Sequence, residues 1–72
     1  MMFRQEKFYI ICDGVKTMAL NDDNQIYWID DIRKAFLFSD FQEAELYRRK
    51  NFKEEFHCFP IVRPILIQHL VL

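Results

Sequence analysis

The chain has 72 residues, of which 51% are hydrophobic and 17% aromatic. Its ten Lys and Arg residues nearly balance eleven Asp and Glu, which gives a formal charge of -1. This length predicts one small domain over residues 1–72, and the aromatic content excludes a disordered chain. The balanced charge argues against a dedicated nucleic-acid binder, which is usually strongly basic.

The sequence shows no sign of a targeting or membrane-spanning segment. Residues 1–7 do not contain a basic region followed by an apolar core, and no run reaches the roughly 18 apolar residues of a membrane span. Cys12 and Cys58 are too few for a secreted domain of this size, which typically uses about two to four disulfides. We therefore expect reduced, mostly buried cysteines, a cytoplasmic protein and no membrane partner.

Three strands are predicted in the first thirty residues. Residues 8–12 are aromatic and β-branched, and Asp13-Gly14 follows them, the dipeptide that type I′ hairpin turns prefer. Residues 15–20 form the returning strand, residues 21–24 are four consecutive turn formers, and residues 25–29 resume the strand pattern. This segment should be an antiparallel meander.

Two helices are predicted next. Asp30 can cap a short helical turn over residues 31–35, with Ile32 and Ala35 directed inward. Ser39 with Gln42 three residues later matches the capping box, so a longer helix should begin at Asp40 and end near Asn51 in a left-handed cap. One face of this helix should pack on the sheet. The predicted core comprises Phe8, Ile10, Trp28, Phe38, Phe41, Ala44 and Tyr47.

The last part of the chain predicts a returning strand. Residues 52–57 mix charge and aromatic residues and are expected to form a connector, with a brief strand as the alternative. Residues 61–62 and 65–72, which follow it, read as strand. Pro60 and Pro64 lack the amide donor of a central ladder, so they place this segment at a sheet edge or strand start. The predicted fold class is α+β: a three-stranded antiparallel meander, one short and one longer helix on one face, and a C-terminal strand.

The C-terminal strand also predicts self-association. Six large apolar residues lie in its final eight positions, and the last charged residue is Arg63. Helices on one face can hide only alternate positions of such a strand. A homodimer would bury the others along an edge formed by Ile65, Ile67, Leu70 and Leu72. The alternative is a central strand covered on both faces.

The residue patterns do not indicate a metal or catalytic site. Asp22, Asp23, Asp30 and Asp31 lack the spacing of a calcium loop and are better explained as turn and cap residues. Cys12, His57, Cys58 and His69 lack the short spacings of structural zinc sites. The chain has one glycine, which rules out a phosphate-binding glycine loop. We expect no cofactor, no metal and no catalytic residue.

A basic run is the strongest polar signal. Arg48, Arg49, Lys50 and Lys53 surround an aromatic residue, a composition that suits phosphate contact and base stacking. A charged helix end produces the same run, because cations are favourable near the helix carbonyls. Together with the acidic Asp22 and Asp23, these cations make the surface dipolar, and we expect both groups to contribute to binding a partner.

One segment resembles a pattern in small uncharacterised proteins of phages and prophages. In that pattern a hairpin ends in Tyr-Trp-x-x-Asp, an Ala-x-x-Phe turn follows, and a Glu-Ala helix comes next. Residues 18–36 and 38–45 carry the similarity. Some proteins of this size and origin inhibit bacterial defence systems, including CRISPR effectors, by binding their surfaces. The resemblance thus implies a phage-encoded inhibitor acting in the host cytoplasm.

The sequence as a whole predicts a small non-enzymatic module that binds a protein partner, with a homodimer as a further possibility. The alternative function is nucleic-acid binding at Arg48 to Lys53. The third candidate function is that of an enzyme, which would have to use the acidic residues between Asp22 and Asp31 or Cys58.

Overall fold

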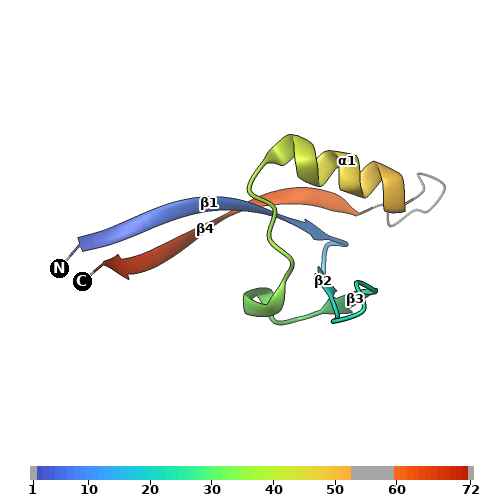
Figure 1. The fold of residues 1–72 in the computed structure, drawn as a ribbon, viewed down its shortest axis with the longest axis horizontal. Helices are drawn as coiled ribbons and strands as arrows, with labels where there is room; N and C mark the ends of the chain where they lie inside the picture. Colours follow the sequence, from blue (N-terminus) through green and yellow to red (C-terminus); the bar gives the residue numbers. More distant parts are fainter. Residues whose placement is uncertain (1, 53–59, 72) are drawn as a thin grey trace.

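A computed structural model of the chain describes residues 2–52 and 60–71 (Figure 1). The sheet has the strand order β3-β2-β1-β4, and each neighbouring pair is antiparallel. This arrangement confirms the predicted α+β class, meander and C-terminal strand. The elements are β1 (Met2–Cys12), β2 (Thr17–Leu20), β3 (Ile26–Ile29), the 3-10 turn η1 (Ile32–Lys34), α1 (Phe41–Asn51) and β4 (Ile61–Val71).

The longest feature is the ribbon formed by β1 and β4. Its register runs without interruption from Met2 opposite Val71 to Cys12 opposite Ile61. In Figure 1, α1 lies over the part of this ribbon that is far from the chain ends, and the other part projects beyond it. We call the projecting part, residues 2–7 and 66–71, the arm. The arm gives the molecule a length of 48 Å against widths of 24 and 22 Å.

β1 and β2 separate immediately after their hairpin. Only Cys12 and Thr17 are paired between them. The segment 36–38 occupies the opening: the Phe36 amide donates to the Met18 carbonyl at 2.9 Å, and Tyr9 and Phe38 exchange hydrogen bonds of 2.8 and 2.9 Å. The sheet therefore curls, because β2 and β3 turn away from the plane of the ribbon (Figure 1).

The core lies between α1 and the curled sheet. Ile11, Met18, Phe38 and Ala44 are its buried residues, and each is at most 4% exposed. Partly buried hydrophobic residues pack around this cluster: Tyr9, Ile26, Trp28, Tyr47, Phe52 and Val62. The predictions for Phe38, Ala44, Trp28 and Tyr47 are thus confirmed.

The predictions for Phe41 and Phe8 require correction, and the prediction for Ile10 is confirmed as to its burial but not as to the face of the sheet. Phe41 is 47% exposed, because it is the first residue of α1 and the sheet is approached one turn later, by Ala44. Ile10 is buried, but neighbouring strand residues point to opposite faces, so Ile11 faces α1 and Ile10 faces away. Phe8, on the same side as Ile10, is only half-buried.

The first hairpin differs from the predicted type I′ turn. Its central residues are Gly14 and Val15, and of these only Gly14 has a positive φ, at 100°. The Asp13 carboxylate accepts hydrogen bonds from the amides of Val15 at 2.9 Å and Lys16 at 2.7 Å. Asp13 therefore acts as an acceptor at the start of the turn instead of a central residue.

The helix caps are shifted from their predicted positions. Asp31, one residue after Asp30, caps η1, and Asp40, one residue after Ser39, caps α1 by accepting from the Gln42 amide. At the other end, the cap residue is Phe52 in an extended conformation, and the Asn51 side chain donates to the Tyr47 carbonyl. Ile32 is 48% exposed, which corrects its predicted inward position.

Within residues 2–52 and 60–71, none of the helices has the length and apolar character needed to cross a membrane.

Candidate functional site

The outward side of α1 carries two exposed apolar residues, Phe41 and Leu46, next to a hollow. At 3.6 residues per turn, Phe41 and Leu46 are about 140° apart around the helix axis, and Glu45, Arg49 and Gln42 fall between them. Ala44 lies outside this arc and is fully buried against the sheet. We call the five residues Phe41, Gln42, Glu45, Leu46 and Arg49 the α1 face.

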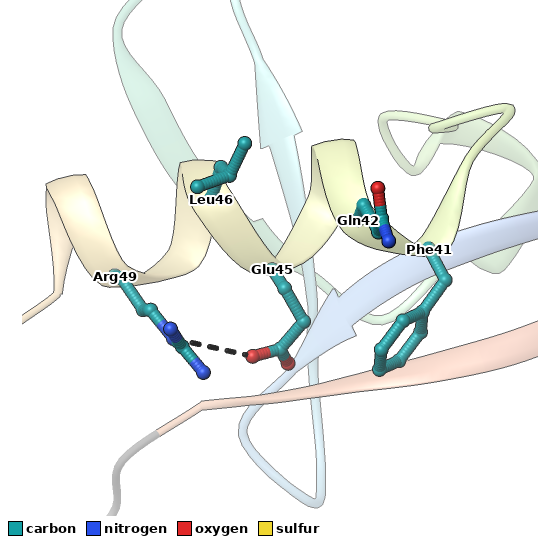
Figure 2. A pocket seen from close by; sticks show the side chains of 5 residues that line it. All are labelled: Phe41, Gln42, Glu45, Leu46 and Arg49. Atoms are coloured by element: carbon teal, nitrogen blue, oxygen red, sulfur yellow. Dashed lines mark ion pairs between the residues drawn. The ribbon is translucent and has the colours of Figure 1, made fainter.

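The α1 face lines an open hollow of about 510 Å³. In Figure 2, Phe41, Glu45 and Arg49 project from one side of the helix at successive turns, whereas Leu46 projects from another side. Phe41 is 47% and Leu46 66% exposed. Two apolar side chains thus border a polar strip, which consists of Gln42, Glu45 and Arg49. This composition is found where proteins contact one another.

Ion pairs hold the polar strip in place. Arg48 donates two hydrogen bonds to the Glu45 carboxylate, at 3.0 and 2.7 Å, and Arg49 lies 3.6 Å from the same group. The Arg48 side chain is only 11% exposed, so this bidentate pair lies partly shielded from water. Hydrogen bonding by Arg48 lowers the pKa of Glu45, which keeps the carboxylate ionised near neutral pH.

The predicted basic site is partly neutralised by this arrangement. Arg48 and Arg49 both pair with Glu45, while Lys50 is exposed at the end of α1. Lys53 lies outside the described residues, so its part of the prediction stays open. Arg48, Arg49 and Lys50 all lie in the last turn of α1. Their positions fit the interpretation of the basic run as a charged helix end.

The predicted acidic residues lie in the turn between β2 and β3. Asp22 and Asp23 are exposed, and the Asn21 side chain organises the turn by accepting from the amides of Asp23 and Gln25, each at 2.9 Å. Asp22 and Asp23 thus occupy the turn that the sequence indicated. Their role in partner binding stays a prediction.

The other acids have local structural partners. Asp31 accepts from the Arg33 amide at 3.0 Å and forms an ion pair with the Arg33 guanidinium, which lowers the pKa of Asp31. The described residues contain no group of three or more His, Cys, Asp and Glu side chains placed to hold a metal ion. Cys12 is a buried free thiol, while His57 and Cys58 lie outside the described residues.

A second, smaller hollow lies on the opposite face of the ribbon. It has a volume of about 230 Å³, and Ile10, Cys12, Ile32, Arg63 and Ile65 are among its lining residues. Ile32 of η1 thus lies on the Ile10 side of the sheet and not on the α1 side. Arg63 is the one charged residue of this lining.

The predicted dimer edge is an outer edge of the sheet. Among residues 2–52 and 60–71, β4 pairs with β1 on one side and is last in the strand order, unlike the central strand considered from the sequence. Ile65, Ile67 and Leu70 lie on this strand, and Leu72 is outside the described residues. Ile65 and Ile67 are half-buried.

Sequence reasoning missed Leu46 and the exposure of Phe41. The available signal was the small size of Ala44. A small residue in the middle of an apolar stripe indicates where the helix lies closest to the sheet. Residues on the opposite side of the helix then stay exposed to solvent.

Comparison of the chain with protein-family models, curated proteins and solved structures finds no match in any of the three.

Proposed function

We propose that this chain is a non-enzymatic module that binds a protein partner, and that the partner docks on the α1 face. The observation that carries the proposal is the pair of exposed apolar side chains, Phe41 and Leu46, beside the 510 Å³ hollow. Apolar side chains fixed on a helix bury surface on binding with little loss of conformational entropy.

The polar part of the α1 face supports a protein partner over a small apolar ligand. Glu45 and Arg49 lie between Phe41 and Leu46 around the helix. The ion pair with the mostly buried Arg48 side chain holds the Glu45 carboxylate in position. The partner surface should therefore offer apolar depressions for Phe41 and Leu46 with polar groups between them. Charged groups arranged in this way mainly determine specificity and the rate of association.

The described residues give less support to a catalytic role. None of them is a buried charged or polar residue. The one carboxylate in the larger hollow whose pKa is shifted, Glu45, has a lowered pKa and an arginine partner. A general acid or base near neutral pH needs a pKa close to the working pH, which the shift of Glu45 moves away from.

The resemblance to small phage proteins adds a proposal about the class of partner. Some small phage proteins inhibit bacterial defence systems by binding the surface of a host protein, and the α1 face is a surface of the kind that such binding would use.

Site-specific photocrosslinking tests the docking surface. A photoreactive amino acid replaces Leu46 in cells that express the protein, and the matched control places it at Val15, which is 85% exposed on the first hairpin. We expect one discrete adduct with another protein from position 46, none from position 15, and loss of the adduct when Phe41→Asp is added.

Equal labelling from both positions, or no adduct from position 46, would overturn the proposal. A circular dichroism melt of each variant shows whether Phe41→Asp has left the fold intact. If Phe41→Asp disturbs the fold, Gln42→Arg replaces it as the second variant, with the photoreactive amino acid again at position 46. Gln42 is exposed and lines the same hollow.

A further inference from the structure

The arm is the least supported part of the sheet. Over residues 2–7 and 66–71, β1 and β4 pair only with each other among the described residues. A two-stranded ribbon is at best marginally stable in water, and three or more strands are normally needed. Among the described residues, no third strand supports the arm.

The orientation of the backbone groups on β4 follows from the Tyr9–Phe38 bridge. Both the amide and the carbonyl of Tyr9 bond to Phe38, so neither points toward β4. Tyr9 and its partner Pro64 are thus a non-hydrogen-bonded pair, and backbone groups of Pro64 point to the outer edge. Because the register is unbroken, residues 66, 68 and 70 also direct their amides outward.

This orientation explains why Pro64 is tolerated within β4. A proline at an outward position removes no bond of the β1–β4 ladder. It does remove one donor from the outer edge, so the continuous row of outward amides begins at Leu66. Any strand that adds to β4 would pair with residues 66–70 and stop before Pro64.

The two free edges of the arm differ in charge. On β1, Arg4 and Lys7 are exposed and Arg4 forms a 3.4 Å ion pair with Glu6, so three charged residues lie within four positions. On β4, the last charged residue is Arg63, and Leu66 is 66% exposed. Charged residues are a common protection of sheet edges, and within the arm only β1 carries Arg, Lys, Asp or Glu residues.

We propose that the protein forms a two-fold symmetric homodimer in which the β4 edges of two copies pair antiparallel through the arm. Gln68 would lie opposite Gln68 of the second copy, and Leu66 opposite Leu70 of the second copy. Each such pair exchanges two hydrogen bonds. The two arms together would form a four-stranded sheet in the order β1-β4-β4-β1.

A second copy is the occupant that these observations favour. The edge is self-complementary, because a two-fold axis at Gln68 brings together two uncharged edges and leaves Pro64 of each copy outside the ladder. The β1 edges, with their charges, remain on the outside. This inference uses the arm and is independent of the α1 face, which lies over the other part of the ribbon (Figure 1).

A matched pair of proline variants tests the edge. Gln5 and Gln68 are opposite each other in the register, both are exposed, and both direct their amides outward, but on opposite edges. Sedimentation equilibrium at micromolar concentration should give about twice the chain mass of 8.9 kDa for the wild type and Gln5→Pro, and 8.9 kDa for Gln68→Pro.

A cysteine pair keeps the test decisive if the prolines disturb the arm. Gln68→Cys should form a covalent dimer under mild oxidation, because facing strand residues near a two-fold axis lie within disulfide distance. Gln5→Cys and the wild type should not. A wild type of 8.9 kDa, a dimeric Gln68→Pro or covalent dimers from Gln5→Cys alone would overturn the proposal.

Discussion

Phe41 rests edge-on against Tyr9, with ring centroids 5.7 Å apart and an angle of 69° between the ring planes. Tyr9 is itself fixed by its backbone bridge to Phe38, and the Lys7 ammonium lies 5.7 Å from its ring centroid. Tyr9 therefore holds Phe41 in position while Phe41 stays 47% exposed. Because about half of its surface stays exposed, Phe41 is accessible to a partner. For the same reason it contributes less to stability than a buried phenylalanine.

The first prediction compares Phe41 with Phe38. Phe38 is 4% exposed, so Phe38→Ala should destabilise the fold by about 3–5 kcal/mol through lost burial and a cavity. Phe41→Ala removes one aromatic pair and about half of a full side-chain burial, and should cost about 1.5–2.5 kcal/mol. Urea unfolding followed by circular dichroism measures both. Equal losses would mean that Phe41 belongs to the core after all.

The second prediction separates the two candidate caps of α1. Asp40 accepts from the Gln42 amide at 3.3 Å, so Asp40→Ala should destabilise the protein by about 1 kcal/mol. Ser39→Ala, the change that the sequence pattern would have selected, should stay within about 0.5 kcal/mol of the wild type. Thermal melts of the two variants decide this, and a larger effect of Ser39→Ala would contradict the observed cap.

The elements of the fold were predictable because local residue patterns specify them. Aromatic and β-branched runs predict the strands, and polar residues before the helix predict its start to within one residue. The choice between Ser39 and Asp40 was not predictable, because both side chains are good cap acceptors and the path of residues 36–38 between β1 and β2 decides which one reaches the Gln42 amide.

The candidate site was harder to predict because it depends on which helix face meets the sheet. Phe41, Ala44 and Tyr47 are three residues apart and suggest one stripe, yet the axis of contact passes through Ala44 and Tyr47 and leaves Phe41 at its margin. The exposure of Phe41 therefore arises from three-dimensional packing. The pairing of Glu45 with Arg48 and Arg49 is different, because these residues lie three and four positions along the same helix and are neighbours on its surface.

The third prediction concerns Ala44, which has no exposed surface between α1 and the sheet. Ala44→Leu adds three carbon atoms to a filled space and should destabilise the protein by about 1–3 kcal/mol. Leu46→Ala on the outward side of the same helix should change stability by about 0.5 kcal/mol or less. If Ala44→Leu were neutral in chemical unfolding, the helix would not approach the sheet where the structure places it.

The last prediction concerns pH. Arg48 lowers the pKa of Glu45 from its ordinary value of 4.5 in the folded chain. A carboxyl group whose pKa is lower when folded contributes stability that is present above 4.5 and is lost as the pH falls through the folded value. The wild type should therefore be more stable than Glu45→Gln at pH 6, by about 0.5–1 kcal/mol for a partly shielded pair.

This difference should shrink as the pH is lowered through the acidic range, because protonated Glu45 no longer attracts Arg48. Asp13 and Asp31 also have lowered pKa values, from their backbone and arginine partners, but both variants keep them, so they cancel in the comparison. Glu43→Gln is the matched control, since Glu43 is exposed on the same helix. Melting temperatures of the three proteins from pH 6 to pH 3 test the effect. A Glu45→Gln deficit that stays constant, or grows, toward low pH would show that Arg48 does not stabilise the ionised carboxylate.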